Sequence, residues 1–532
     1  MSGKHVRIKP VLTLADVTIN AMALIAPGAF LWLTFQMQAA QNINGKTTAA
    51  DMVPGLLTAL ALAFLTAYSY SQLANLFPNA GAGSSYYFAE AALLKRKAGG
   101  QYKFARLAKF IVGWVSHLYY WVYPGLIVGT FAVLTQYIAA HILGLAFAAS
   151  NWFAYATAIF TAITTGTIAY RGIKGSTAIS FIINIIQIVS LVILGLLAIL
   201  YRIEHPHNTY TFPSAASIVI PHSFSGVIFQ AAIAILLLVG FESITALSAE
   251  TQKAKKNIPA GILLSLAIQG LIMYLFEYFA ANYFMGTQYT GPNATKGLAA
   301  AAYSSAPIGD MAVIIGNWLG GFGKLFAVCI ALTVMIALIG TTLACLNTGV
   351  RITNAMGRDN ELPELFGAIH HKSLAPHLGI IVLTVVSAVI GFYCSAGFTI
   401  GGVTFSEADT LSQITYTTNI GTFLLYGMTC LITLLAFHAK MKDFHIIKHR
   451  VIPALGLIAN IGLLIGIFAL AAISGGAAAL DAKIAIGAAI VFALFGAGLF
   501  FIRSRIFNIA IFYQPKPEAF HGKVRAKAQP EM

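Results

Sequence analysis

Long runs of hydrophobic residues, separated by short polar segments, cover almost the whole chain. A bilayer core about 30 Å thick is crossed by about 20 apolar helical residues, and runs of about this length occur twelve times. They cover residues 12–37, 52–77, 106–142, 152–170, 175–201, 222–249, 259–284, 322–350, 378–396, 411–437, 451–473 and 482–503. The runs are continuous rather than alternating, so they predict an all-α integral membrane protein and not a barrel of strands. The third run is too long for one upright span, so we expect it to tilt or to extend into water.

Most of the basic residues between the runs lie on one side of the predicted membrane. If the N-terminus lies in the cytoplasm, 27 of the 32 Lys and Arg residues fall on the cytoplasmic side. The other side has only Lys46, Arg202, Lys296, Lys324 and Lys483. Short cytoplasmic loops of membrane proteins carry such an excess of Lys and Arg. One missed span would move every later loop to the opposite side of the membrane and make the distribution of basic residues more even. We therefore expect twelve spans in the cell membrane, with tails 1–11 and 506–532 both in the cytoplasm.

Composition excludes several other classes of protein. Of the 532 residues, 58% are hydrophobic and only 9% are charged, whereas soluble domains average about 25% charged residues. The net charge of +15 comes from short clusters between apolar runs, so it indicates orientation in the bilayer and not nucleic-acid binding. The four cysteines show no CxxC spacing and are interpreted as buried hydrophobes. With no P-loop and no catalytic constellation in the runs, we expect no enzyme, no metal and no cofactor.

Two of the twelve runs contain residues that interrupt a helix. The first has Ala26-Pro27-Gly28 at its middle, and the sixth has Gly240-Phe241-Glu242. Proline removes a backbone donor, and glycine tolerates the backbone geometry that results. Either feature alone is common in membrane helices, as a simple kink or as a close helix contact.

The positions of the two interruptions together indicate a transport site. They lie in the first helices of two five-span halves, 12–201 and 222–437, with an accessory pair of spans at 451–505. An odd number of spans per half makes the halves run in opposite directions. Interrupted helices at matching places in two inverted halves are typical of transporter binding sites, where free amides face an anion and free carbonyls face a cation.

Glu242 is the acidic residue placed at such an interruption. An ionisable residue at membrane depth is costly and suggests a function, although a structural hydrogen bond to a neighbouring helix is the alternative. A low-dielectric surrounding favours the uncharged carboxyl, so Glu242 could take up and release a proton. Glu277, expected near the outer interface, and the aromatic run 119–123 are interpreted as structural.

Three segments resemble the amino acid–polyamine–organocation (APC) superfamily of permeases. Residues 240–262, GFESITALSAETQKAKKNIPAGI, are similar to the family's GFE segment followed by an acidic residue, lysines and N-x-P. Residues 77–91, FPNAGAGSSYYFAEA, resemble its proline, small-residue and aromatic stretch. Residues 351–366, RITNAMGRDNELPELF, resemble its R-D-x-x-L-P pattern. The three occur in order at spacings similar to those of the family.

The resemblance implies a LeuT-like fold of ten core helices in a five-plus-five inverted repeat. It also implies that span 1 amides bind the carboxylate of the substrate and that nearby carbonyls of spans 1 and 6 bind the amino group of the substrate. Phe241 would lie beside the substrate. The implied substrate-binding residues are Ile25, Ala26, Pro27, Gly28, Ala29, Val239, Gly240 and Phe241. Many relatives have Gly-x-Gly at the span 1 break, whereas this chain has Ala26-Pro27-Gly28.

The coupling ion is left open between a proton and sodium. Some proton-coupled relatives have a lysine in span 5, and the nearest residue here is the uncharged Gln187. Thr341 and Thr342 lie near the place where sodium-coupled relatives of the fold bind the ion, although paired threonines often bond back to their own helix. We predict an amino acid or amine transporter that is a proton symporter through Glu242. Sodium symport and exchange are the alternatives.

Two further classes stay possible on the sequence alone, a channel and a transporter-like nutrient sensor that binds without moving its ligand. Channels usually show a re-entrant filter or a ring made by oligomer symmetry, whereas this chain shows internal pseudo-symmetry. Few charges occur within the runs, which disfavours a dicarboxylic or dibasic substrate. The sequence does not otherwise indicate which amino acid or amine is carried.

Overall fold

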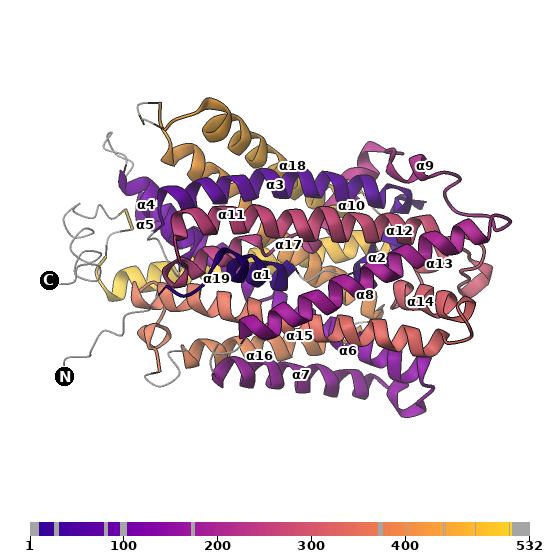
Figure 1. Ribbon diagram of the computed structural model, residues 1–532. Coiled ribbons are helices and arrows are strands. Elements are labelled where there is room, and N and C mark those ends of the chain that lie inside the picture. The colour runs from indigo at the N-terminus through magenta and orange to yellow at the C-terminus, as the bar shows by residue number, and fades with distance from the viewer. Residues whose placement is uncertain are drawn as a thin grey trace.

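The computed structural model describes residues 10–25, 31–78, 83–95, 104–171, 176–370, 376–400, 402–439, 441, 443–473, 475–509 and 511–512. Helices dominate this part of the chain, and the long ones run side by side along one axis (Figure 1). Two short antiparallel hairpins are present, with Asn42 opposite Thr47 and Phe398 opposite Phe405.

The first half of the chain contains helices α1 to α8 and the first hairpin. Their bounds are α1 (Leu14–Ile25), α2 (Leu31–Ala40), β1 (Asn42–Ile43), β2 (Lys46–Thr47), α3 (Met52–Leu76), α4 (Ser85–Lys95), α5 (Ala105–Tyr120), α6 (Tyr123–Gln136), α7 (Asn151–Arg171) and α8 (Ser176–Glu204). The second half contains α9 (Ala215–Val219), α10 (Phe224–Ala234), α11 (Ala254–Leu266), α12 (Phe276–Phe284), α13 (Leu298–Ala301), α14 (Pro307–Trp318), α15 (Gly323–Arg358), α16 (His377–Cys394), β3 (Phe398–Ile400), β4 (Val403–Phe405), α17 (Glu407–Ala436), α18 (Ile452–Ile473) and α19 (Gly476–Ile506).

Eleven helical stretches of the described chain are long and apolar enough to cross a membrane. They correspond one by one to the second through twelfth hydrophobic runs. Some join neighbouring helices, such as Ala105–Ile142, which contains α5 and α6, and Ala254–Phe284, which contains α11 and α12. The chain is therefore a multi-pass, all-α membrane protein.

The first hydrophobic run forms two shorter helices. Helix α1 has 12 residues and α2 has 10, which correspond to about 18 and 15 Å at a rise of about 1.5 Å per residue. Neither reaches across a bilayer core of about 30 Å alone. Residues 26–30, which include the predicted interruption, lie outside the described part of the chain.

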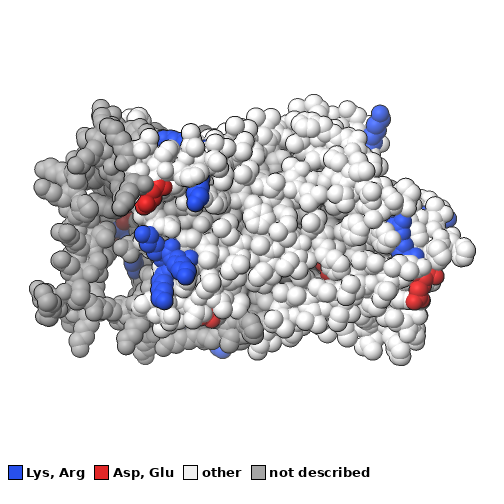
Figure 2. All heavy atoms as spheres, turned by 45° about the horizontal axis from the view of Figure 1, so that its top comes forward, with Lys and Arg blue, Asp and Glu red and all other residues white. Residues whose placement is uncertain are grey.

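The surface of the bundle divides into an apolar belt and two polar ends. Large hydrophobic side chains such as Ile185, Leu455, Val491 and Phe495 are exposed along it, as expected where lipid is the solvent. In Figure 2 most of the visible middle is free of charged residues, and blue Lys and Arg side chains lie toward both ends, with the larger group at the left.

Several ion pairs connect elements at one end of the bundle. Arg351 at the end of α15 pairs with Glu250, which follows the sixth span, at 3.0 Å. Arg106 at the start of α5 pairs with Glu361 at 2.7 Å and is buried, and Lys109 contacts Asp359 at 2.6 Å. We call this the basic end of the molecule.

Candidate functional site

The sixth span changes its helix geometry in the middle. Helix α10 continues into a 3₁₀ turn, Ile235–Leu237, and a second 3₁₀ segment, Phe241–Glu250, begins after a turn. Gly240 in this turn has φ of +123°, a backbone conformation that residues with a side chain rarely adopt. A Cβ atom on Gly240 would lie 2.8 Å from Leu24 Cγ and 3.1 Å from the Leu24 carbonyl carbon. The turn therefore packs directly on the end of α1, and only glycine fits there.

Glu242 lies directly after this turn and is 1% exposed. Its Oε1 accepts a hydrogen bond from the Tyr120 hydroxyl at 2.8 Å. Its Oε2 accepts hydrogen bonds from the Tyr426 hydroxyl at 2.8 Å and from the Gly240 N–H at 3.1 Å. Tyr120 belongs to α5 and Tyr426 to α17, so one carboxylate joins the interrupted span to two other helices.

Aromatic side chains surround the same point. The Phe241 ring lies 5.3 Å from the Tyr426 ring and 6.1 Å from the Tyr70 ring, measured between centroids. All three side chains are fully buried. Ser85 donates a hydrogen bond to the Tyr70 hydroxyl at 2.8 Å, which fixes the orientation of that ring. Phe241 thus forms part of an apolar and aromatic wall beside Glu242.

The carbonyl groups at the end of α1 are bound by side chains from other helices. The last carbonyls of a helix have no partner within it. Here the Ala23 carbonyl accepts a hydrogen bond from Thr341 at 3.0 Å, and the Ile25 carbonyl accepts one from Tyr274 at 2.8 Å. Each carbonyl oxygen has two lone pairs, so these bonds orient the end of α1 and leave capacity for a further donor.

The candidate ion-site residues behave differently from one another. The Thr342 hydroxyl donates to the Leu338 carbonyl of its own helix at 2.8 Å, which is the ordinary back-bonding of a membrane threonine. The Thr341 hydroxyl reaches both its own helix and α1. Gln187 on α8 is 1% exposed, and its Nε2 has no hydrogen-bond partner among the described residues.

The structure places the sequence-predicted substrate residues in two groups. Ile25, Val239, Gly240 and Phe241 are buried in the region where α1 meets the turn of the sixth span. Ala26, Pro27, Gly28 and Ala29 lie outside the described residues, between the end of α1 and the start of α2.

The residues that bind Glu242 are not predicted by the sequence. The aromatic run that contains Tyr120 favours a packing role, although the Tyr120 hydroxyl contacts the carboxylate, and no pattern singles out Tyr426. The available signal is a tyrosine hydroxyl within an apolar run, since a buried hydroxyl needs a partner. Glu277, which the sequence predicts near the outer interface, is buried between helices. Its side chain is 2% exposed, with neither carboxyl oxygen bonded to any described residue.

The beginning of the chain and the end of the sixth span meet at the basic end. The backbone N–H groups of Val11 and Leu12 donate to the Glu250 carbonyl at 2.8 and 3.0 Å. The Gln252 N–H donates to the Leu12 carbonyl at 2.8 Å. Spans 1 and 6 are therefore connected here as well as at Gly240.

Residues of the three quoted motifs converge near this junction. Lys109 contacts Glu90 at 3.0 Å as well as Asp359, and the Tyr86 hydroxyl donates to Asp359 at 3.1 Å. Burial raises the pKa of the Glu90 carboxyl, and the neighbouring Lys109 ammonium opposes that increase. Together with the pairing of Arg351 and Glu250, these contacts tie four helical elements at one end of the site.

Comparisons with known proteins give a consistent family. The family model described as amino acid permease matches residues 40–515. The chain is 24% identical over 368 residues to the methylthioribose transporter of Bacillus subtilis (strain 168), covering 67% of this chain and 71% of the relative. It is 23% identical over 375 residues to the branched-chain amino acid permease of Lactococcus lactis subsp. cremoris (strain MG1363), covering 67% and 72%.

A third relative has a different substrate in its name. The low-affinity putrescine importer of Escherichia coli (strain K12) is 24% identical over 393 residues, covering 72% of this chain and 75% of the relative. The names of the three relatives thus include a thio-sugar, branched-chain amino acids and a diamine.

Proposed function

This chain belongs to the amino acid permease family, and on that premise we propose that it is a secondary active transporter working by alternating access. Its substrate is an amino acid or a related amine, and its energy comes from a coupled proton. The observation that carries the proposal is the buried Glu242, which joins the interrupted sixth span to α5 and α17.

We propose a LeuT-like architecture of twelve crossings, with halves 12–201 and 222–437. Two contacts support an even number of crossings, because they place both ends of the described chain at the basic end. The Val11 N–H donates to the Glu250 carbonyl there, and the Ile509 carbonyl accepts a hydrogen bond from Arg106. Eleven long stretches, together with the α1 and α2 pair as one broken span, give twelve crossings. The excess of Lys and Arg then places the basic end in the cytoplasm.

The substrate's charged groups are proposed to bind at the two broken helices. We propose that a carboxylate binds around Pro27, Gly28 and Ala29, because the amides and partial positive charge at a helix amino terminus suit an anion and α2 is described from Leu31 onward. The amino group would bind carbonyls near Ile25 and Val239. The tyrosine bond that orients the Ile25 carbonyl supports this assignment.

The surroundings of Glu242 favour a substrate with one amino group and an apolar side chain. Both carboxyl oxygens of Glu242 already accept hydrogen bonds from tyrosines, and one also accepts the Gly240 N–H. A second ammonium would therefore have to displace one of these donors to pair with Glu242. Phe241 and its aromatic neighbours offer an apolar surface instead.

The donors around Glu242 support proton coupling. An ionised carboxylate accepts the three bonds strongly, whereas a protonated carboxyl accepts them more weakly and needs an acceptor for its own proton. If that acceptor is the hydroxyl of Tyr120 or Tyr426, the tyrosine must turn its own O–H away from Glu242. Protonation would therefore loosen the sixth span from its neighbours, and the proton would favour one of the two facing states.

Uptake into proteoliposomes tests the coupling, with pH and sodium gradients imposed separately. We expect accumulation of a neutral apolar amino acid into inside-alkaline vesicles. Glu242→Gln should abolish that response while counterflow exchange survives, and Tyr426→Phe should weaken it. Thr342→Ala is the matched control, because it alters the candidate sodium site, and its hydroxyl bonds to the Leu338 carbonyl of its own helix and not to Glu242 or α1. Accumulation driven by sodium alone, or an intact proton response in Glu242→Gln, would refute the proposal.

A further inference from the structure

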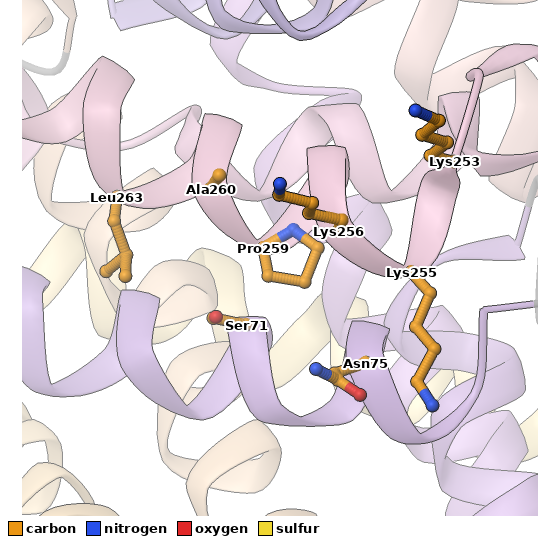
Figure 3. Close-up of a pocket in the computed structure, with 8 residues that line it drawn as sticks. All are labelled: Ser71, Asn75, Lys253, Lys255, Lys256, Pro259, Ala260 and Leu263. Carbon is orange, nitrogen blue, oxygen red and sulfur yellow. The ribbon is translucent and has the colours of Figure 1, made fainter.

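A cavity of about 490 Å³ lies between α3 and the start of α11 (Figure 3). It lies at the basic end, because α11 begins directly after the segment that pairs with Val11 and Leu12. Helix α3 contributes two polar side chains to its walls, and the start of α11 contributes lysines and apolar side chains. The lining residues are Ser71, Asn75, Lys253, Lys255, Lys256, Pro259, Ala260 and Leu263.

Charged and apolar residues of the cavity are separated along α11. Three lysines come at the beginning of the helix, and Pro259, Ala260 and Leu263 follow. Lys255 and Leu263 are eight positions apart, or about 12 Å along a helix at a rise of about 1.5 Å per residue. Because the spanning stretch begins at Ala254, the lysines lie at the membrane boundary and the apolar residues lie deeper.

The three lysines form no ion pair with any described acidic residue, unlike Arg106, Lys109 and Arg351 at the same end. All three are exposed. In Figure 3, the Lys255 side chain extends beside Asn75 of α3. The cavity therefore has several unpaired positive charges and neutral hydrogen-bonding groups around its opening, and no acidic residue lines it.

We propose that this cavity binds the headgroup of an anionic phospholipid and the first part of its acyl chain. A phosphate beside Asn75 would meet the Lys255 ammonium group, and the chain would continue over Ala260 and Leu263. In Figure 3 the ammonium groups of Lys253 and Lys256 point away from Asn75, so they would attract the headgroup from a greater distance. A free phosphate would match only the polar half of the cavity. Basic pockets between spanning helices are the kind of surface that binds such headgroups.

The bound lipid would bridge α3 and α11, which pack against each other. It would therefore stabilise the arrangement of these two helices that the structure shows. This inference does not depend on the coupling ion or on the transported substrate, so it can fail while the proposed transport activity stands.

Thermal unfolding of the purified, delipidated protein in detergent tests the inference. Phosphatidylglycerol should raise the Tm, and phosphatidylcholine with the same chains should not. Each lysine near an anionic lipid strengthens the binding of that lipid. The loss of two such lysines should weaken the affinity for the lipid by about 30-fold. The double variant Lys255→Ala/Lys256→Ala should therefore need about 30-fold more phosphatidylglycerol for the same shift.

A matched control removes two exposed lysines from the other end, Lys296→Ala/Lys324→Ala, and should respond as the unaltered protein does. Glycerol 3-phosphate and inorganic phosphate provide the headgroup chemistry without chains and should give no shift. Equal shifts with phosphatidylcholine, equal shifts with the soluble phosphates, or an unchanged response in the Lys255 and Lys256 variant would each overturn the inference. If that variant has a low Tm without lipid, native mass spectrometry of bound phosphatidylglycerol decides between the outcomes.

Discussion

Gly240→Ala tests whether the turn of the sixth span must be made by glycine. The added methyl group would lie 2.8 Å from Leu24 Cγ, 3.0 Å from Leu24 Cβ and 3.1 Å from the Leu24 carbonyl carbon. The last of these is backbone, which cannot rotate away as a side chain can. The substitution also places a side chain at φ of +123°, where residues other than glycine are strained.

The two effects can be estimated separately. A non-glycine residue in a sparsely populated backbone region costs about 1–3 kcal/mol. An extra methyl group in a closely packed site costs about 1–3 kcal/mol more. Their sum is roughly 2–6 kcal/mol, which for a protein of this size corresponds to a fall in Tm of about 2–5 °C. Since the Gly240 N–H donates to Glu242, transport should fall together with the Tm.

Thermal unfolding in detergent and uptake into proteoliposomes measure the two consequences. Gly427→Ala is the matched control, because its new methyl group would meet Asn460 Cβ at 3.6 Å and Leu457 Cδ1 at 3.7 Å. Those are ordinary contacts, and alanine favours the helical backbone by about 1 kcal/mol over glycine. If Gly240→Ala unfolds within about 1 °C of the unaltered protein and transports normally, the reasoning about this turn is wrong.

Two further predictions concern charged residues outside the turn. Arg351→Glu should lower uptake several-fold, because it places two carboxylates together at the basic end. The double variant Arg351→Glu/Glu250→Arg should restore much of the uptake. Uptake that is equally low in both variants would contradict a role for this ion pair. The Tm should change little in either, since partly exposed ion pairs contribute only about 0–1 kcal/mol. Glu277→Gln should leave the Tm unchanged or raise it, because the buried carboxyl has no hydrogen bond to a described residue to lose. A fall in Tm of more than about 5 °C would show that the carboxyl has a bonded partner.

The membrane-spanning helices could be predicted from sequence because burial in lipid imposes a simple rule. Each span must be apolar for about 20 residues, and a run such as 411–437 satisfies this without reference to the rest of the fold. The structure has a spanning stretch at Glu407–Ala436. The special backbone at Gly240 could also be anticipated, because a regular spanning helix needs neither a glycine nor a nearby acidic residue in the middle of its apolar run.

The partners of the polar residues could not be predicted in the same way. Tyr426 lies 184 positions from Glu242, and no local pattern shows which of many tyrosines comes within 2.8 Å of a given carboxylate. The same holds for Glu277, because its distance from Pro259 along the helix concerns depth and not which side of the helix is covered. Only the packing of α12 against α8 shows that its side chain is buried.

The contacts of spans 1 and 6 indicate which parts of the site move together. Leu24 packs on Gly240 near the interruptions, and Leu12 bonds to the Gln252 N–H at the basic end. Helix α1 and the segment Phe241–Glu250 are thus joined at both of their ends, so we expect them to move as one unit. Glu242 joins this unit to α5 and α17, and Glu250 joins it to α15, where the Thr341 hydroxyl also bonds to the Ala23 carbonyl. In the proposed alternating-access cycle, opening the basic end would break the Glu250 connection, and a proton on Glu242 would weaken the connection that lies nearest the proposed substrate site.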